Sequence, residues 1–174
     1  MRKLVFLVLL TGFAFANSLV LQNGKIQAHT EVFGDSSINP SSNTLESKLE
    51  IKDSIQSIKG VVSIQSLSLV SDNKDRDKHM YEVLNVSVNP KIIFSIVSIN
   101  KDKSGYKING FLTLNGITKK IKTHSVITQK DKNISINGDF SILLTDFGIE
   151  PPSMFFLTVR DQIDINYNLD LLKG

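Results

Sequence analysis

Three histidines are the side chains of this chain with the widest chemical range, because imidazole serves as an acid, a base or a metal ligand. His29, His79 and His124 lie far apart and lack the close spacing of most zinc motifs. The chain has no cysteine, which excludes thiol catalysis and cysteine metal sites. Convergence of the three histidines in the fold stays open, but hydrogen-bonded or solvent-facing histidines are favoured. We therefore predict no metal and no cofactor.

The sequence motifs of the common enzyme classes are missing. There is no G-x-S-x-G elbow, no P-loop and no dinucleotide-binding fingerprint. Asp146, Phe147 and Gly148 spell the magnesium motif of protein kinases, but no glycine-rich loop or catalytic loop accompanies them. We interpret these residues as a turn in which Gly148 supplies an unusual backbone angle. The chain is predicted not to be an enzyme, and a hydrolase on a barrel rim would need a converging histidine–carboxylate cluster.

Charged side chains are spread along the chain rather than clustered. Twenty Lys and Arg stand against 17 Asp and Glu, a net charge of +3. Nucleic-acid binding needs a basic stripe or patch, so we predict no nucleic-acid partner. Lys119, Lys120 and Lys122 follow the Asn115-Gly116 pair and could attract an anionic head group at a barrel mouth. A solvated surface is the favoured interpretation of these lysines.

The N-terminal residues 1–16 have the pattern of a cleavable signal peptide. Arg2 and Lys3 precede a short apolar run, and residues 14–16 read Ala-Phe-Ala, a small-x-small cleavage pattern. The run is shorter than the ~20 residues that span a bilayer. We predict cleavage after Ala16, export across a membrane, and no membrane span in the released domain, residues 17–174.

Alternation of apolar and polar residues dominates the rest of the chain and predicts an all-β protein. Residues 45–51 and 163–171 alternate strictly, which is typical of strands with one apolar and one wet face. Asn115-Gly116 between two alternating runs is a hairpin signal. Eight strands are predicted, near 19–33, 44–53, 56–70, 91–100, 105–114, 117–128, 133–145 and 157–171.

A charged segment near 73–85 breaks this alternation and places Met80, Val83 and Leu84 at helical spacing. It predicts a short helix that plugs one end of the sheet structure, with a polar loop as the alternative. About eight antiparallel strands allow a closed barrel or a two-sheet sandwich. A barrel of that size has room for side chains or for one small ligand.

Four stretches, taken together and in order, resemble one family. Residues 76–94 are similar to its R-D-x-H-hydrophobic and P-x-I-x-F patterns, and residues 109–121 to its G-x-L-T-hydrophobic-x-G-x-T-x-x-V pattern. Residues 140–149 match F-x-I followed by D-F-G-I, and residues 159–165 resemble the closing D-x-V-x-I strand. The family is the YceI-like, polyisoprenoid-binding, lipocalin-like proteins, and the resemblance covers about residues 55–172.

The resemblance implies an eight-stranded antiparallel lipocalin-like barrel with an elongated apolar cavity. It implies a periplasmic protein that binds a long isoprenoid or another amphiphilic lipid, such as a quinone-like lipid or a fatty amide, without catalysis. The ligand-binding wall is predicted from the inward parity of the strands and from an apolar lip beside Pro151-Pro152, with core packing as the competing role of each residue. Its members are Phe94, Ile96, Leu112, Leu114, Ile121, Phe140, Ile142, Phe155, Phe156, Ile163, Ile165 and Tyr167.

A second function stays open from the residues alone. The same barrel with a filled core could act as a non-enzymatic protein–protein interaction module of the cell envelope. A cavity of ~300 Å³ or more would favour lipid binding, whereas a filled interior with an exposed apolar patch would favour the module. An exposed strand edge also leaves a homodimer open.

Overall fold

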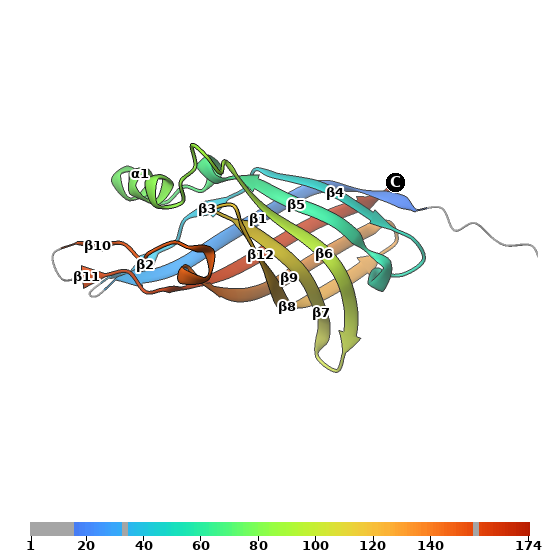
Figure 1. Ribbon diagram of the computed structural model, residues 1–174. Helices are drawn as coiled ribbons and strands as arrows, with labels where there is room; N and C mark the ends of the chain where they lie inside the picture. Colours follow the sequence, from blue (N-terminus) through green and yellow to red (C-terminus); the bar gives the residue numbers. More distant parts are fainter. Residues whose placement is uncertain (1–15, 33–34, 155–156) are drawn as a thin grey trace, which may run out of the picture.

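The computed structural model describes residues 16–32, 35–154 and 157–174, and its main feature is a closed antiparallel barrel of eight long strands (Figure 1). Each long strand pairs with the next along the chain, and the last pairs with the first to close the barrel. This confirms the predicted fold class. The long strands are β1 (Asn17–Val32), β4 (Leu45–Ile51), β5 (Lys59–Gln65), β6 (Lys91–Asp102), β7 (Gly105–Leu114), β8 (Ile117–Lys130), β9 (Asn133–Leu143) and β12 (Gln162–Lys173).

Short elements gather at one end of the barrel, which we call the mouth end (Figure 1, left). They are α1 (Lys74–Val83), β2 (Asp35–Ile38), β3 (Ser41–Ser42), the 3-10 turn η3 (Thr145–Phe147), β10 (Ser153–Met154) and β11 (Leu157–Thr158). The other end, the closed end, holds the start of β1, the end of β12 and the turn η1 (Ile55–Ser57). Predicted residues 1–15 of the signal peptide lie outside the described part of the chain.

The strand predicted over 56–70 is wrong in length, because β5 covers only residues 59–65 and a second 3-10 turn, η2 (Ser66–Ser68), follows it. Serine side chains at both ends compete with the ladder by bonding to nearby backbone. Ser57 Oγ accepts from the backbone N–H of Lys52 (2.9 Å), and Ser68 Oγ donates to the carbonyl of Gln65 (2.7 Å). The strand predicted from 157 likewise begins only at Gln162, after the separate strand β11.

The interior is tightly filled at the closed end. Inward side chains of β12 and β9 face one another in register, with Leu169 opposite Ile136 and Leu171 opposite Ile134. These four side chains belong to one cluster of buried residues, the closed-end cluster, and each of the four is at most 5% exposed. Leu171 and Ile134 do not border the cavity described below, whereas Leu169 and Ile136, one pair nearer the mouth, do, so the filled region lies beyond them.

A bulge in β6 keeps its apolar side chains facing inward over its whole length. Ile96 pairs with Gly110, and the next pair is Ser98 with Asn109, so Val97 is an extra residue. Val97 points outward, while Ile99 beyond it returns to the core at 3% exposure. Because of this extra residue, side chains on both sides of the bulge, Ile96 and Ile99, face the barrel interior.

The turn at residues 144–149 closes the mouth end of β9. The N–H of Ile149 donates to the carbonyl of Leu144 (3.1 Å), and the N–H of Gly148 donates to that of Thr145 (3.1 Å). Gly148 has φ +64°, so these bonds form the pattern that ends helices with a left-handed glycine. Phe147 between them is 1% exposed. The tripeptide is therefore a turn, as predicted, and its aromatic ring is a core side chain.

Helix α1 lies across the mouth end and confirms the predicted helix. Asn73 caps it, since its side-chain oxygen accepts from the backbone N–H groups of Asp75 and Arg76, each at 3.0 Å. Asp77 accepts from the N–H of Ser71 (2.9 Å), and Tyr81 donates to the carbonyl of Leu69 (2.6 Å). Within the described ranges, no helix is long and apolar enough to cross a membrane.

Candidate functional site

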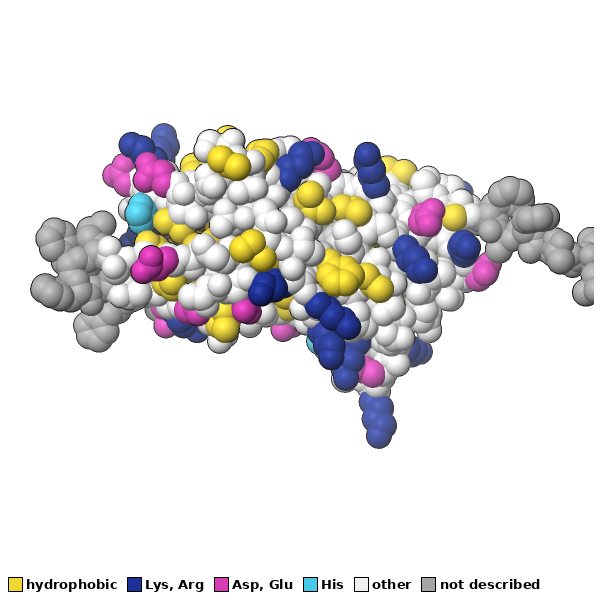
Figure 2. Space-filling model, in the orientation of Figure 1, with side chains coloured by type: hydrophobic (Ala, Val, Ile, Leu, Met, Phe, Trp, Pro, Cys, Tyr) yellow, Lys and Arg dark blue, Asp and Glu magenta, His cyan; other side chains and the backbone are white. Residues whose placement is uncertain are grey.

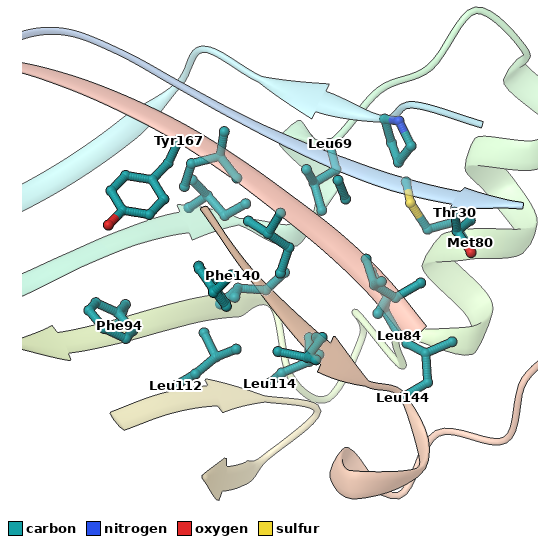
Figure 3. Close-up of a pocket in the computed structure, with 18 of the residues that line it drawn as sticks. Thr30, Leu69, Met80, Leu84, Phe94, Leu112, Leu114, Phe140, Leu144 and Tyr167 are labelled. Carbon is teal, nitrogen blue, oxygen red and sulfur yellow. The ribbon is translucent and has the colours of Figure 1, made fainter. Parts of the chain in front are cut away.

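A cavity of about 560 Å³ occupies the mouth half of the barrel, and Figure 3 shows side chains that line it. Its wall is mostly apolar and comes from the strands together with α1. In Figure 3, Tyr167 lies at one end of this space, and Thr30 and Met80 lie at the other, beside α1. The cavity is thus elongated from the mouth towards the filled closed-end cluster, and we call its Tyr167 end the inner end.

Most of the sequence-predicted wall residues lie on this cavity. Those that line it are Phe94, Ile96, Leu112, Leu114, Phe140, Ile142, Ile163, Ile165 and Tyr167. The register explains this, because Ile163 faces Ile142 and Ile165 faces Phe140 across β12 and β9. Phe155 and Phe156 lie outside the described residues.

Ile121 is predicted in the wall but does not line the cavity. Like Phe94, it packs against the mouth-end cluster, the buried residues Ile64, Leu69, Leu84, Leu112, Leu114, Ile142, Leu144, Phe147 and Ile149. Its partner across β7 and β8 is Gly110, which has no side chain. The ring of Phe94 lies over Gly110, where an added Cβ would be 2.5 Å from Phe94 Cζ. The aromatic ring therefore occupies the stretch of wall next to Ile121.

Sequence reasoning missed the contribution of α1 to the wall. Arg76, His79, Met80 and Val83 all line the cavity. Their spacing of three and four residues puts them on one face of a helix, so the signal was present. The sequence prediction gives the helix only the role of a plug. Its inner face instead brings a thioether and two basic side chains to the mouth.

Three aromatic side chains form a row around the inner part of the cavity. The rings of Phe94 and Phe140 are stacked with centroids 6.3 Å apart, and those of Phe140 and Tyr167 are tilted with centroids 6.2 Å apart. Both separations are in the range of favourable aromatic pairs. The row gives this part of the wall a rigid shape.

The Tyr167 hydroxyl is the polar feature of the inner end. It lies 2.9 Å from Thr123 Oγ1 and 2.6 Å from Ser125 Oγ, and Thr123 donates to the carbonyl of Asp139 (2.8 Å). Burial raises the pKa of Tyr167 above its usual 10, and the hydrogen bonds to Ser125 and Thr123 partly oppose this. The phenol is therefore uncharged at neutral pH.

Gly138 makes room for this ring, and Gly138→Ala is expected to displace it. An added Cβ would lie 2.4 Å from Tyr167 Oη and 2.7 Å from the backbone oxygen of His124. The cost should be about 1–3 kcal/mol of unfolding free energy, as for other overpacked sites, measured by urea denaturation. Gly24→Ala is the control, because its added Cβ would meet the flexible tip of Leu45 at 3.1 Å. Equal losses in both variants would contradict the assignment.

Paired charges surround the mouth. Arg76 of α1 bonds Asp35 of β2, and Arg160 bonds Asp164 and lies 3.5 Å from Glu31. Hydrogen bonds from Ser37, followed by Arg76, hold the pKa of Asp35 at about 2. The Arg76–Asp35 pair connects the helix to β2 across the opening and keeps a guanidinium at the edge of the cavity.

Acid is expected to break this connection only near pH 2. The folded pKa of Asp35 lies below its ordinary 3.8, so the stabilisation is present above the ordinary value and is lost as pH falls through about 2. Ser37→Ala should raise the pKa more than Arg76→Gln, since the serine hydroxyl has the largest effect. Carboxyl NMR titration measures each pKa. Titration of wild-type Asp35 at its ordinary value would contradict the geometry.

Each histidine lies near one carboxylate: His29 is 3.5 Å from Glu31 and His79 is 3.8 Å from Glu82, and no described pair of histidines shares a carboxylate. The third histidine, His124, has both a serine and a carboxylate beside it, at the β6–β7 turn. His124 Nε2 lies 3.0 Å from Ser104 Oγ and 3.7 Å from Asp102 Oδ1. Both partners approach the same ring nitrogen, so the arrangement cannot relay a proton from serine through histidine to the carboxylate. It supports the β6–β7 turn.

The three β8 lysines are exposed and do not line the cavity. Figure 2 shows Lys and Arg side chains gathering over β7 and β8 towards the β6–β7 turn. The basic side chains that reach the cavity are instead Arg76 and His79 of α1. Any head-group contact at the mouth would therefore involve the helix rather than these lysines.

Comparison with known proteins gives a family match over nearly the whole barrel. The family model "YceI-like domain" matches residues 20–171. Among curated relatives, a UPF0312 protein of Pectobacterium atrosepticum is 36% identical over 96 residues, 51% of this chain and 50% of that protein. Protein YceI of Escherichia coli is 33% identical over 97 residues, 51% of each chain. The chain spans about half the length of the curated relatives it matches.

Solved structures share the fold at low sequence identity. BcnA of Burkholderia cenocepacia superposes with a TM-score of 0.73 at 14% identity, covering 84% of this chain and 95% of that one. A polyisoprenoid binding domain from Saccharophagus degradans superposes with a TM-score of 0.63 at 10% identity, covering 91% and 98%. These likenesses establish the barrel architecture.

Proposed function

We propose that this chain, which belongs to the YceI-like domain family, holds a long isoprenoid or similar amphiphile in its barrel. The apolar part of the ligand lies in the cavity, and its polar head lies at the mouth beside α1. The protein binds its ligand and does not transform it.

The cavity is the observation that carries this proposal. Its volume of about 560 Å³ falls within the ~300–1,000 Å³ of small-molecule sites. Its wall is apolar along most of its length, and a hydrocarbon chain gains about 0.8 kcal/mol for each methylene removed from water. The alternative function, an interaction module, would need a filled interior, and a cavity of this volume favours lipid binding over it.

The mouth carries polar side chains, whereas the cavity wall further in is mostly apolar, and an amphiphile needs both. Arg76 and His79 stand on the inner face of α1, and Thr30 of β1 and Ser71 also line this end. These groups can bond a polar head while the tail lies among Phe140, Leu112 and their neighbours. A ligand with a hydrocarbon tail and one polar head fits this distribution.

Location and assembly belong to the same proposal. The basic start, apolar run and Ala16 cleavage pattern support export to the periplasm, where a carrier of apolar chains would have a use. The N-terminal sequencing of protein from the periplasmic fraction tests cleavage. A homodimer stays a prediction, and the mass of the native protein tests it.

Titration with a defined probe tests the proposed function. Geranylgeraniol, added as a competitor, is expected to displace the apolar dye N-phenyl-1-naphthylamine from the purified protein at one site per chain. Dye binding that geranylgeraniol does not reduce, or no saturable binding of either, would refute the proposal.

A further inference from the structure

A cluster of three hydroxyls stands at the inner end of the cavity, away from the polar side chains of the mouth. Tyr167 of β12 and Thr123 of β8 line the cavity, and Ser125 lies behind them at 1% exposure. The three oxygens are joined by contacts of 2.9 Å and 2.6 Å. An apolar tail alone gives no reason for hydroxyls at this depth, since a Phe and a Val would fill the same space.

The three hydroxyls can still form a hydrogen bond with a ligand after their own hydrogen bonds are made. Thr123 donates to the carbonyl of Asp139, so Thr123 can accept from Tyr167, and Ser125 can donate to Tyr167. The tyrosine oxygen then keeps one lone pair free. Rotation of the Thr123 hydroxyl towards Tyr167 instead frees the phenolic proton for a ligand. The cluster can thus accept a hydrogen bond from a bound group or donate one to it.

At the inner end, the lack of charged side chains in the described part of the wall determines which ligand groups can bind there. Among the described residues that line the cavity, Arg76 and Asp77 carry charge, and both lie on α1 at the mouth. Among the described wall residues of the inner end, none carries a charge that would balance a carboxylate. A carboxylate placed there would be desolvated without a partner, whereas an uncharged hydroxyl or carbonyl would be satisfied.

The geometry points to a second polar subsite, formed by Tyr167, Thr123 and Ser125, that takes an uncharged hydrogen-bonding group at the far end of the ligand chain. This inference rests on the proposed lipid-binding function and narrows its ligand class. The favoured ligand is polar at both ends, with a head at α1 and a neutral hydroxyl or carbonyl at the inner end.

Three matched ligand series test the subsite. Plain fatty acids, ω-hydroxy fatty acids and α,ω-dicarboxylic acids of graded chain length present a methyl, a hydroxyl or a carboxylate to the inner end. Their dissociation constants are measured by competition with N-phenyl-1-naphthylamine. At the length that spans the cavity, the ω-hydroxy acid should bind wild type at least as tightly as the plain acid, and the dicarboxylic acid should bind more weakly than both.

Two variants make the test specific. Tyr167→Phe and Thr123→Val should each weaken ω-hydroxy acid binding about three- to tenfold relative to the plain acid, the value of one uncharged hydrogen bond. Phe94→Leu, a control in the same region, should change both ligands equally. An unchanged ratio at every length in both hydroxyl variants would overturn the subsite while the proposed function stands. If none of the three series binds wild type while geranylgeraniol does, the subsite is overturned and the proposed function stands; if geranylgeraniol also fails to bind, both are overturned.

Discussion

Replacing Ile165 with tryptophan is expected to weaken binding of an apolar ligand about a hundredfold while the barrel stays folded. Ile165 faces Phe140 across β9 and lines the cavity. It is only partly buried, so a larger side chain can extend into the free space. An indole there would displace about four methylenes of ligand, at about 0.8 kcal/mol each, which corresponds to roughly a hundredfold in the dissociation constant.

Asn166→Trp is the matched control for Ile165→Trp. Asn166 is the next residue of β12, and its side chain is exposed on the outer face of the barrel. Competition with N-phenyl-1-naphthylamine should give wild-type affinity for this variant. Loss of affinity in both variants, or in neither, would contradict binding inside the barrel.

Phe147→Ala is expected to lower the free energy of unfolding by about 3–5 kcal/mol, which is the usual cost of removing a buried phenylalanine. The ring is 1% exposed and packs in the mouth-end cluster with Leu144 and Ile149. The carbonyl of Phe147 also accepts from Asn115 Nδ2 (3.1 Å), which ties this turn to the β7–β8 hairpin. Removing the ring leaves a void where the 144–149 turn packs beside the β7–β8 hairpin. Urea denaturation measures the loss of unfolding free energy.

Asp146→Ala separates the core role of Phe147 from a role of the tripeptide as a whole. Asp146 is exposed, so its replacement should change the free energy of unfolding by no more than about 0.5 kcal/mol. A large loss of unfolding free energy in Asp146→Ala, or a small one in Phe147→Ala, would contradict the claim that the turn is stabilised by packing of the Phe147 ring.

The barrel could be predicted because its strands carry strict alternation and its turns carry specific residues. The run from Ile163 to Leu171 fixed which side chains face inward, and the register with β9 confirms that assignment. Asn115 and Gly116 have φ of +49° and +73°, which the predicted hairpin turn requires. Alternation alone did not reveal the bulge at Val97, because one extra residue changes parity without leaving a local signal.

The mouth end could not be predicted to the same depth. Parity says which face of a strand is inward, but it does not say whether a neighbouring ring covers the position, as Phe94 does beside Ile121. The Arg76–Asp35 pair joins residues 41 positions apart, and only the fold brings them together. The Tyr167 hydroxyl cluster is hidden for the same reason, since its members come from two strands that are not paired with each other.

Mass spectrometry of lipids that co-purify with the protein tests the central claim most directly. The wild-type chain and the Asn166→Trp variant are expected to yield the same amphiphile, with a long hydrocarbon part, at up to one molecule per chain. The Ile165→Trp variant, purified in parallel, should yield little of it. Wild-type protein that carries no lipid and takes up none from a total lipid extract would contradict lipid binding in the barrel.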